Sequence, residues 1–98
     1  MIVVVRLPAA LAEYAGGSRA VPVEVPPDAV LGDVIAALGS QFPMVQRRIV
    51  DETGKLRRFV NVYVGNDECR PLGGLGVRVP PDTQVSVIGS IAGGADST

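Results

Sequence analysis

Side chains that could carry out catalysis are scarce in this 98-residue chain. It contains no histidine and a single cysteine, Cys69. A Ser-His-Asp triad and a Cys-His pair both need imidazole, and an ordinary zinc site needs imidazole or several thiolates. Cys69 directly follows Glu68, and nearby negative charge raises the pKa of a thiol. The sequence therefore argues against self-contained hydrolytic chemistry, and we interpret Cys69 as a structural residue.

Two glycine-rich segments remain as candidates for function. Gly73-Gly74-Leu75-Gly76 lacks the Lys-Ser/Thr pair and the helix that follow a phosphate-binding loop. We predict a turn there and no nucleotide binding by this chain itself. Gly93-Gly94 lies near the C-terminus and is followed by Ala95-Asp96-Ser97-Thr98. This pair fits a terminus without function, and it also fits a reactive end that the last residues still cover.

The bulk composition predicts one small domain that is rich in strands. Apolar residues make up 47% of the chain and aromatic residues 4%, so aliphatic side chains that favour strands must fill the core. The formal net charge of −1 leaves no general field that would hold nucleic acid or an anionic membrane. The chain shows no leader and no apolar run of the roughly 20 residues that a spanning helix needs. We expect a cytoplasmic protein.

A run of basic residues surrounds Thr53-Gly54 and comprises Arg47, Arg48, Lys55, Arg57 and Arg58. Charge runs are most often solvated loops and strand entries, and this interpretation is favoured here. The alternative is a docking patch for an acidic partner.

Segments rich in β-branched residues predict strands at residues 2–7, 20–25, 59–64 and 84–91. The first is apolar at successive positions, which is typical of a central strand covered on both faces. Pro22 indicates that the second lies at a sheet edge. In the last strand, Val85, Val87 and Gly89 share one face, and Ile88 is an isolated apolar residue on the other, more polar face.

Helical spacing of apolar residues predicts one main helix from about Asp28, its candidate N-cap, to Phe42. Residues 44–49 could add a helical turn, residues 51–55 read as a loop, and residues 68–72 could form a brief returning strand. A loop containing Gly16-Gly17 is expected between the first two strands.

This order of elements defines an α+β fold in which a mixed sheet wraps around one main helix. The first and last strands are the richest in β-branched residues, so we expect them side by side and parallel at the sheet centre. The predicted domain covers residues 1–91, and a flexible tail of residues 92–98 would project from the end of the last strand.

Four features together resemble the MoaD/ThiS group of ubiquitin-like sulfur carriers, which have the β-grasp fold. They are the element order, the Phe59-Val60-Asn61 strand, the segment PPDTQVSVI, and Ile91-Ala92-Gly93-Gly94. The likeness extends over residues 1–94, and the segment GKLRRFVNVYVGNDE followed by GGL is most similar to the carrier of cysteine biosynthesis. The diglycine after a strand is the specific part of this resemblance.

The resemblance implies a carrier or co-substrate protein that is not itself an enzyme. An ATP-dependent E1-like activating enzyme would adenylate the Gly94 carboxylate, and a thiocarboxylate formed there would pass its sulfur to a synthase. The acceptor is left open among cysteine, molybdopterin and another sulfur-containing metabolite, and a role as the small subunit of a molybdopterin-synthase-like complex is also open. ATP would be used by the activating enzyme, and no cofactor would be bound by this chain. Residues Ile91, Ala92 and Gly93 would thread into partner active sites, where bulkier side chains than glycine would collide with the walls.

The chain departs from the family because Gly94 is joined to Ala95 by an amide bond and cannot be adenylated as it stands. We therefore expect a diglycine-specific zinc protease to cleave between Gly94 and Ala95. A different class of function, a ubiquitin-like modifier or interaction module that forms isopeptide bonds through Gly94, remains an alternative.

Partner docking is expected at Ile88, Arg57, Arg58 and Phe59. Counting back from the diglycine, Ile88 falls where related carriers contact their activating enzyme. A lone surface isoleucine without function is an equally good interpretation.

Overall fold

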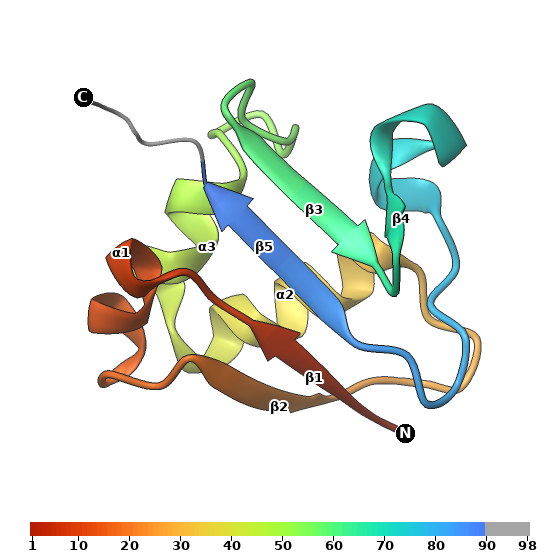
Figure 1. Ribbon diagram of the computed structural model, residues 1–98, viewed down its shortest axis with the longest axis horizontal. Coiled ribbons are helices and arrows are strands. Elements are labelled where there is room, and N and C mark those ends of the chain that lie inside the picture. Colours follow the sequence, from red (N-terminus) through yellow and green to blue (C-terminus); the bar gives the residue numbers. More distant parts are fainter. Residues whose placement is uncertain (90–98) are drawn as a thin grey trace.

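A computed structural model describes residues 1–89, which form a five-stranded mixed sheet with helices packed on one side (Figure 1). The strands are β1 (Ile2–Arg6), β2 (Ala20–Glu24), β3 (Val60–Val64), β4 (Asp67–Glu68) and β5 (Val85–Gly89). The α-helices are α1 (Ala9–Ala12), α2 (Leu31–Gln41) and α3 (Pro43–Ile49). Short 3₁₀ turns are η1 (Glu13–Ala15), η2 (Arg70–Leu72) and η3 (Gly74–Gly76).

The sheet order is β2-β1-β5-β3-β4, with β1 and β5 parallel and the other neighbouring pairs antiparallel. Val5 of β1 lies beside Val85 of β5. The predicted α+β fold, with the first and last strands as parallel neighbours at the sheet centre, is confirmed. β2 lies at the edge, as Pro22 indicated, because a residue without an N–H group leaves a gap in a ladder between two strands.

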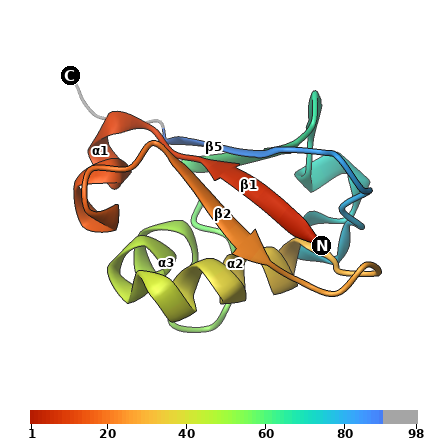
Figure 2. The same ribbon diagram turned by 90° about the horizontal axis from the view of Figure 1, so that it is seen from below.

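The helices cover one face of the sheet only (Figure 2). Val3 and Val5 of β1 are buried beneath them, whereas Ile2 is 57% exposed and Val4 is half-buried. The prediction that both faces of the first strand are covered is therefore wrong. Successive apolar residues are typical of a strand covered by other elements on both faces. In this domain the helices form one layer only, and Ile2 and Val4 lie on the uncovered face of the sheet.

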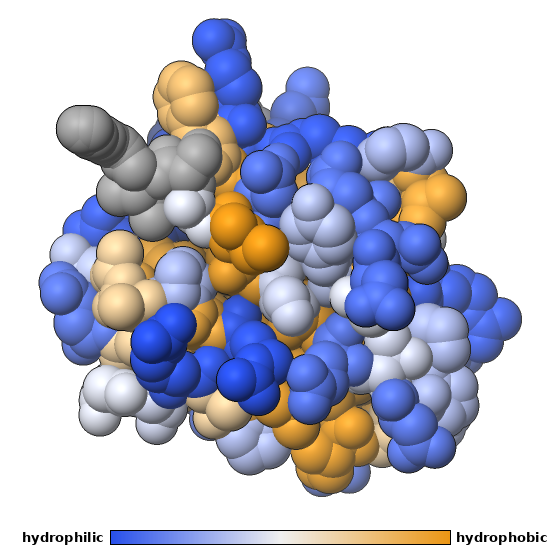
Figure 3. Space-filling view, in the orientation of Figure 1, coloured by the Kyte–Doolittle hydropathy of each residue, from blue (hydrophilic) through white to orange (hydrophobic). Residues whose placement is uncertain are grey.

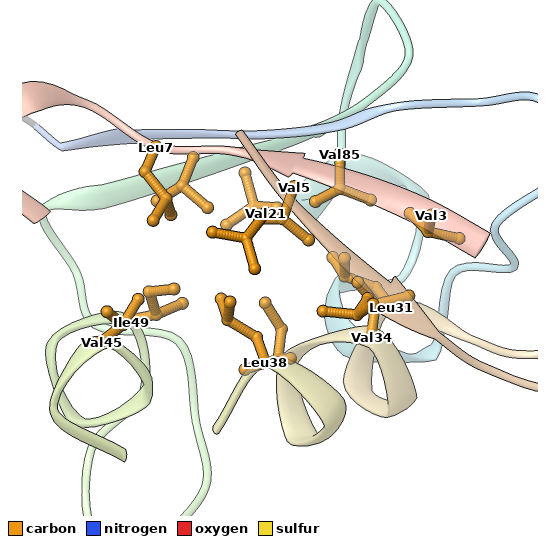
Figure 4. Packing of buried hydrophobic residues seen from close by; sticks show 14 of the residues in the cluster. Val3, Val5, Leu7, Val21, Leu31, Val34, Leu38, Val45, Ile49 and Val85 are labelled. Atoms are coloured by element: carbon orange, nitrogen blue, oxygen red, sulfur yellow. The ribbon is translucent and has the colours of Figure 1, made fainter. Parts of the chain in front are cut away.

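The core lies between the sheet and the pair α2–α3 (Figure 4). Alternate valines of the strands meet Leu31, Val34 and Leu38 of α2, and Val45 and Ile49 of α3. Burying such a set of aliphatic side chains is the main stabilising contribution to a domain of this size.

Helix α2 begins at Leu31, and the prediction of Asp28 as its N-cap is wrong. Before the helix, the Val79 N–H donates to the Ala29 carbonyl oxygen at 3.1 Å, and Val30 forms an isolated bridge with Arg78. The chain is thus held extended beyond Asp28, and the helix can start only afterwards. The Val30 N–H donates to Asp33 Oδ2 at 3.0 Å, so an acidic residue in the first turn caps the helix instead.

The turn proposed at residues 44–49 is a helix, α3, whose first residue is Pro43. It packs close against α2: a side chain at Gly39 of α2 would overlap the Gln46 side chain of α3, so glycine permits this approach. Between β1 and β2, where the sequence predicted only a loop, the chain forms α1 and η1. These two elements are too short to show a helical period, although Leu11, Ala12 and Ala15 are buried.

Among the described residues, no helix has the length and apolarity needed to cross a membrane.

Candidate functional site

Strand β5 ends at Gly89, on the same side of the molecule as α1 and α3 (Figures 1 and 2). β5 pairs with β1 on one side and with β3 on the other, where Gly89 lies opposite Val60. The pairing with β1 covers Val85 and Ser86, and the pairing with β3 continues to Gly89, so β3 limits the movement of the strand end. Residues 90–98, which include the predicted functional positions Ile91, Ala92, Gly93, Gly94 and Ala95, lie outside the described part of the chain.

Ile88 lies on the open face of the sheet, where it is 50% exposed. Val85 and Val87 point into the core, as the alternation predicted. Figure 3 shows apolar atoms on this face over the end of β5. Ile88 contributes with Arg6 and Arg19 to a shallow depression of about 270 Å³. An exposed apolar side chain one residue before the end of β5 is well placed for contact with a partner.

Phe59 immediately precedes β3 and is 66% exposed. The Arg58 guanidinium carbon lies 5.8 Å from the centroid of the Phe59 ring, within the range of a cation–π contact. β3 is antiparallel to β5, so the Arg58–Phe59 pair lies at the same end of the sheet as Gly89. The structure therefore brings two of the predicted docking residues together near the base of the C-terminal segment.

Arg57 takes a different direction from its neighbours. Its Nε–H donates to the carbonyl oxygen of Arg47 at 2.8 Å, which connects the strand entry to helix α3. The fold thus separates the basic residues into two groups. Arg57 lies beside Arg47 and Arg48 of α3, whereas Arg58 contacts Phe59.

Arg70 positions the segment that carries these docking residues. Its guanidinium donates to Asn61 Oδ1 at 3.0 Å and to the carbonyl oxygen of Arg57 at 2.7 Å, and it lies 3.8 Å from Glu68 Oε2. A planar guanidinium suits such a set of acceptors better than an ammonium group would. Arg70 was not among the predicted site residues. No local sequence pattern marks it, because its partners Asn61 and Arg57 lie in another strand and in the loop before that strand.

Cys69 is fully buried in the core. Burial raises the pKa of its thiol, and the neighbouring Glu68 carboxylate raises it further. The interpretation of Cys69 as a structural residue is supported, since a raised pKa leaves little reactive thiolate. The predicted turn at residues 73–76 contains the 3₁₀ element η3 (Gly74–Gly76), with Gly73 before it as the N-cap. No cluster of His, Cys, Asp and Glu suited to a metal ion occurs within residues 1–89.

No protein-family model matches the chain. Sulfur carrier protein CysO of Mycobacterium tuberculosis is 33% identical over 96 residues, which cover 96% of this chain and all of CysO. The chain belongs to the MoaD/ThiS-type family of ubiquitin-like sulfur carriers. Small archaeal modifier protein 1 of Haloferax volcanii is 41% identical over 68 residues, covering 69% of this chain and 76% of that protein.

The β-grasp fold of this sulfur-carrier family is also evident from solved structures. The structure of the Amycolatopsis orientalis BexX/CysO complex contains a chain with a TM-score of 0.83 and 32% identity, covering 94% of this chain and 99% of that chain. These relatives are a carrier and a modifier by name. The Amycolatopsis orientalis structure is of CysO in complex with BexX.

Proposed function

We propose that this protein is a sulfur carrier whose C-terminal glycine, Gly94, bears a thiocarboxylate after residues 95–98 have been removed. The observation that supports this most is the full-length similarity to CysO, combined with a strand, β5, that is paired with β3 to its last residue and ends five residues before Gly94. Five residues can reach about 17 Å when extended. That is enough to enter the cleft of a partner while the domain stays outside.

The chemistry takes place in partner enzymes, because the chain lacks groups that could activate its own carboxylate. The Gly94 carboxylate attacks the α-phosphate of ATP on an E1-like activating enzyme, and pyrophosphate leaves. A sulfide-level sulfur source then displaces AMP and leaves a thiocarboxylate. The nucleophilic sulfur is passed to a synthase, and the similarity to CysO favours a cysteine precursor as its acceptor.

Processing precedes activation, because an adenylate can form only on a free carboxylate and Gly94 is followed by Ala95. We assign this cleavage to a zinc protease that recognises the diglycine. The Ala95-Asp96-Ser97-Thr98 segment consists of small or polar residues, which fit the extended binding cleft of a protease.

Recognition of the activating enzyme is assigned to the open sheet face. Ile88 and the Arg58–Phe59 pair lie on or beside this face at the end of β5. An apolar contact there adds binding energy to a tail that offers few contacts of its own and must be ordered on binding.

Intact-protein mass spectrometry tests the proposal directly. A chain ending at Gly94 is incubated with ATP, the activating enzyme and a sulfur source, and it should gain the mass of one oxygen-to-sulfur exchange. The full-length chain is the matched control and should remain unchanged until the protease is added. A chain ending at Gly94 that never forms an adenylate would exclude the proposal.

A ubiquitin-like modifier is the second candidate, because the Haloferax volcanii relative is named as one. In that case Gly94 would form isopeptide bonds with lysine side chains. Conjugates that survive on a denaturing gel would support this function.

A role as the small subunit of a molybdopterin-synthase-like complex instead predicts a stable heteromer in gel filtration, whereas a carrier that visits several enzymes predicts weak, exchanging complexes.

A further inference from the structure

A groove of about 610 Å³ lies on the helix side of the sheet, next to the point where β5 ends. Its walls come from α1 and η1, from α3, and from the ends of β3 and β5, and Gly89 is one of its lining residues. Figures 1 and 2 show α1, α3 and the end of β5 together at this end of the molecule. The groove and the open face with Ile88 thus flank the base of the C-terminal segment from opposite sides of the sheet.

Three arginines, Arg47, Arg48 and Arg57, line this groove, against one acidic lining residue of the described chain, Glu13. None of the three forms a salt bridge with a carboxylate in residues 1–89, where the ion pair present joins Arg70 and Glu68. The groove lining therefore has an excess of positive charge, in a protein whose formal net charge is −1. Asp51 offsets part of it, because the pKa of this carboxyl is lowered by its hydrogen bond with Thr53 and also by the charge of Arg57. This local charge is complementary to carboxylates supplied from outside.

Two of the guanidinium groups are held in place within the groove. The Arg48 guanidinium carbon lies 4.1 Å from the centroid of the Tyr14 ring, which is cation–π geometry. The Arg57 Nε–H is engaged with the Arg47 carbonyl oxygen, and the two terminal nitrogens of Arg57 form no hydrogen bond with a described residue. Stacked and tethered guanidinium groups lose less entropy on binding a carboxylate than free ones do.

The groove also has an apolar part. Met44 is 44% exposed, and Tyr14 is half-buried beside it. A methionine adapts its shape to an incoming apolar side chain. A phosphate backbone would satisfy the arginines but would leave Met44 without a partner, whereas a peptide can supply both kinds of group.

We infer that this groove docks an acidic segment of a partner protein, with carboxylates placed around one large apolar side chain. A partner that takes up the C-terminal segment would then hold the domain from the helix side as well as from the open sheet face. The inference rests on the charge and lining of the groove, and it does not depend on the sulfur chemistry proposed above.

Peptide binding to the full-length protein tests this inference. The probe is a short synthetic peptide with one leucine between glutamates, added during an NMR titration of the backbone amides at low salt. We expect shifts at Tyr14, Met44, Arg48 and Gly89, and weaker binding of peptides in which the leucine becomes glycine or the glutamates become glutamines. Shifts confined to the open face around Ile88 would overturn the inference.

Charge reversal at one groove position provides the quantitative test. Arg47→Glu should weaken the peptide by about tenfold, which corresponds to about 1.4 kcal/mol. Arg78→Glu is the matched control, because Arg78 is exposed before the start of β5, at the opposite end of that strand from Gly89. Unchanged peptide affinity of the Arg78→Glu variant supports a local binding site. Equal losses of affinity in both variants would show that only the net charge of the protein matters, and would refute the inference.

Two further measurements separate the occupants. A single-stranded oligonucleotide that displaces the peptide at equal concentration would assign the groove to nucleic acid and overturn the inference. Peptide binding that appears only after removal of residues 95–98 would assign the groove to the end of this chain itself, again against a partner segment. Circular dichroism melting of Arg47→Glu checks that the variant is folded, so that a loss of binding can be read as a loss of contact.

Discussion

At the scale of single residues, the proposed function depends on the absence of side chains at Gly93 and Gly94. The domain contributes no imidazole and only one buried thiol, so its proposed reactive group is a main-chain carboxylate. Such a group can be brought into a narrow active site only if the residues leading to it are slim and can adopt many backbone angles. The two glycines meet both requirements.

Gly93→Val in a chain ending at Gly94 should abolish thiocarboxylate formation while leaving the free energy of unfolding within about 0.5 kcal/mol of the parent. The branched side chain would collide with the walls of the activating enzyme's channel. Intact mass after incubation with that enzyme and ATP is the measurement. Gly76→Val is the control, because a Cβ added at Gly76 meets no atom within 4 Å. Undiminished sulfur loading of the Gly93 variant would contradict the channel argument.

Ile88→Ala should weaken the complex with the activating enzyme by about tenfold, since truncating a contact in the middle of an interface costs about 1–2 kcal/mol. The side chain is 50% exposed, so the free energy of unfolding should fall by less than about 1 kcal/mol. Isothermal titration calorimetry measures the affinity. Ile2→Ala provides a matched control, because Ile2 is 57% exposed and lies at the far end of β1. Equal effects of the two substitutions would show that the end of β5 has no special part in docking.

At the scale of elements, Arg70 connects the loop before β3 to the turn after β4. β4 pairs with β3 over two residue pairs only. The hydrogen bonds of Arg70 therefore add a second connection between the segment after β4 and the start of β3. The same guanidinium fixes the main chain at Arg57, so one side chain influences both the groove arginine and the Arg58–Phe59 pair that follows it.

Arg70→Lys should destabilise the protein by about 1–2 kcal/mol, because an ammonium group cannot reach Asn61 and the Arg57 carbonyl oxygen in the same geometry. Urea unfolding measures the loss. Amide shifts of residues 57–59 should change in the same variant, whereas a merely solvated arginine would leave them in place. Arg78→Lys is the control, since Arg78 is exposed and its side chain makes no hydrogen bond to a described residue.

At the scale of the whole molecule, the stability of the domain comes from residues other than the proposed reactive end. The buried aliphatic cluster extends from Val3 to Val87 and draws on both the sheet and the helices. β5 belongs to this core through Val85 and Val87, and through its last residue, Gly89, it also begins the C-terminal segment. The folded part can therefore remain unchanged while the end of the chain is cleaved, activated and discharged.

Removal of residues 95–98 should leave the midpoint of urea unfolding unchanged, to within about 0.5 kcal/mol in the free energy of unfolding. The reason is that the sheet and the helices of residues 1–89 form the core cluster, whereas the last four residues are small or polar. Parallel unfolding of the full-length chain and the chain ending at Gly94 measures the difference. A larger loss on truncation would mean that the extension packs on the domain and does more than cover Gly94.

Local patterns were sufficient for four strands and for the orientation of Ile88. The brief strand expected at residues 68–72 is instead the two-residue strand β4 (Asp67–Glu68), followed by the 3₁₀ turn η2. Alternation of valines assigns residues to the two faces of a strand whatever its neighbours are, and Pro22 marks an edge because it lacks a donor. The diglycine and the family resemblance also come from the sequence alone, and the full-length similarity to CysO supports the resemblance.

Contacts between distant segments decided the rest. Asp28 has the side chain of an N-cap, but the pairing of residues 29–30 with residues 78–79 delays the helix until Leu31. β1 is apolar on both faces, yet the helices cover only one of them. The sequence by itself determined the strands and the chemistry available to the chain end, because both depend on residue type and short-range order. Only the tertiary structure gathered Arg47, Arg48 and Arg57 beside Gly89, since that placement requires α3, β3 and β5 to meet.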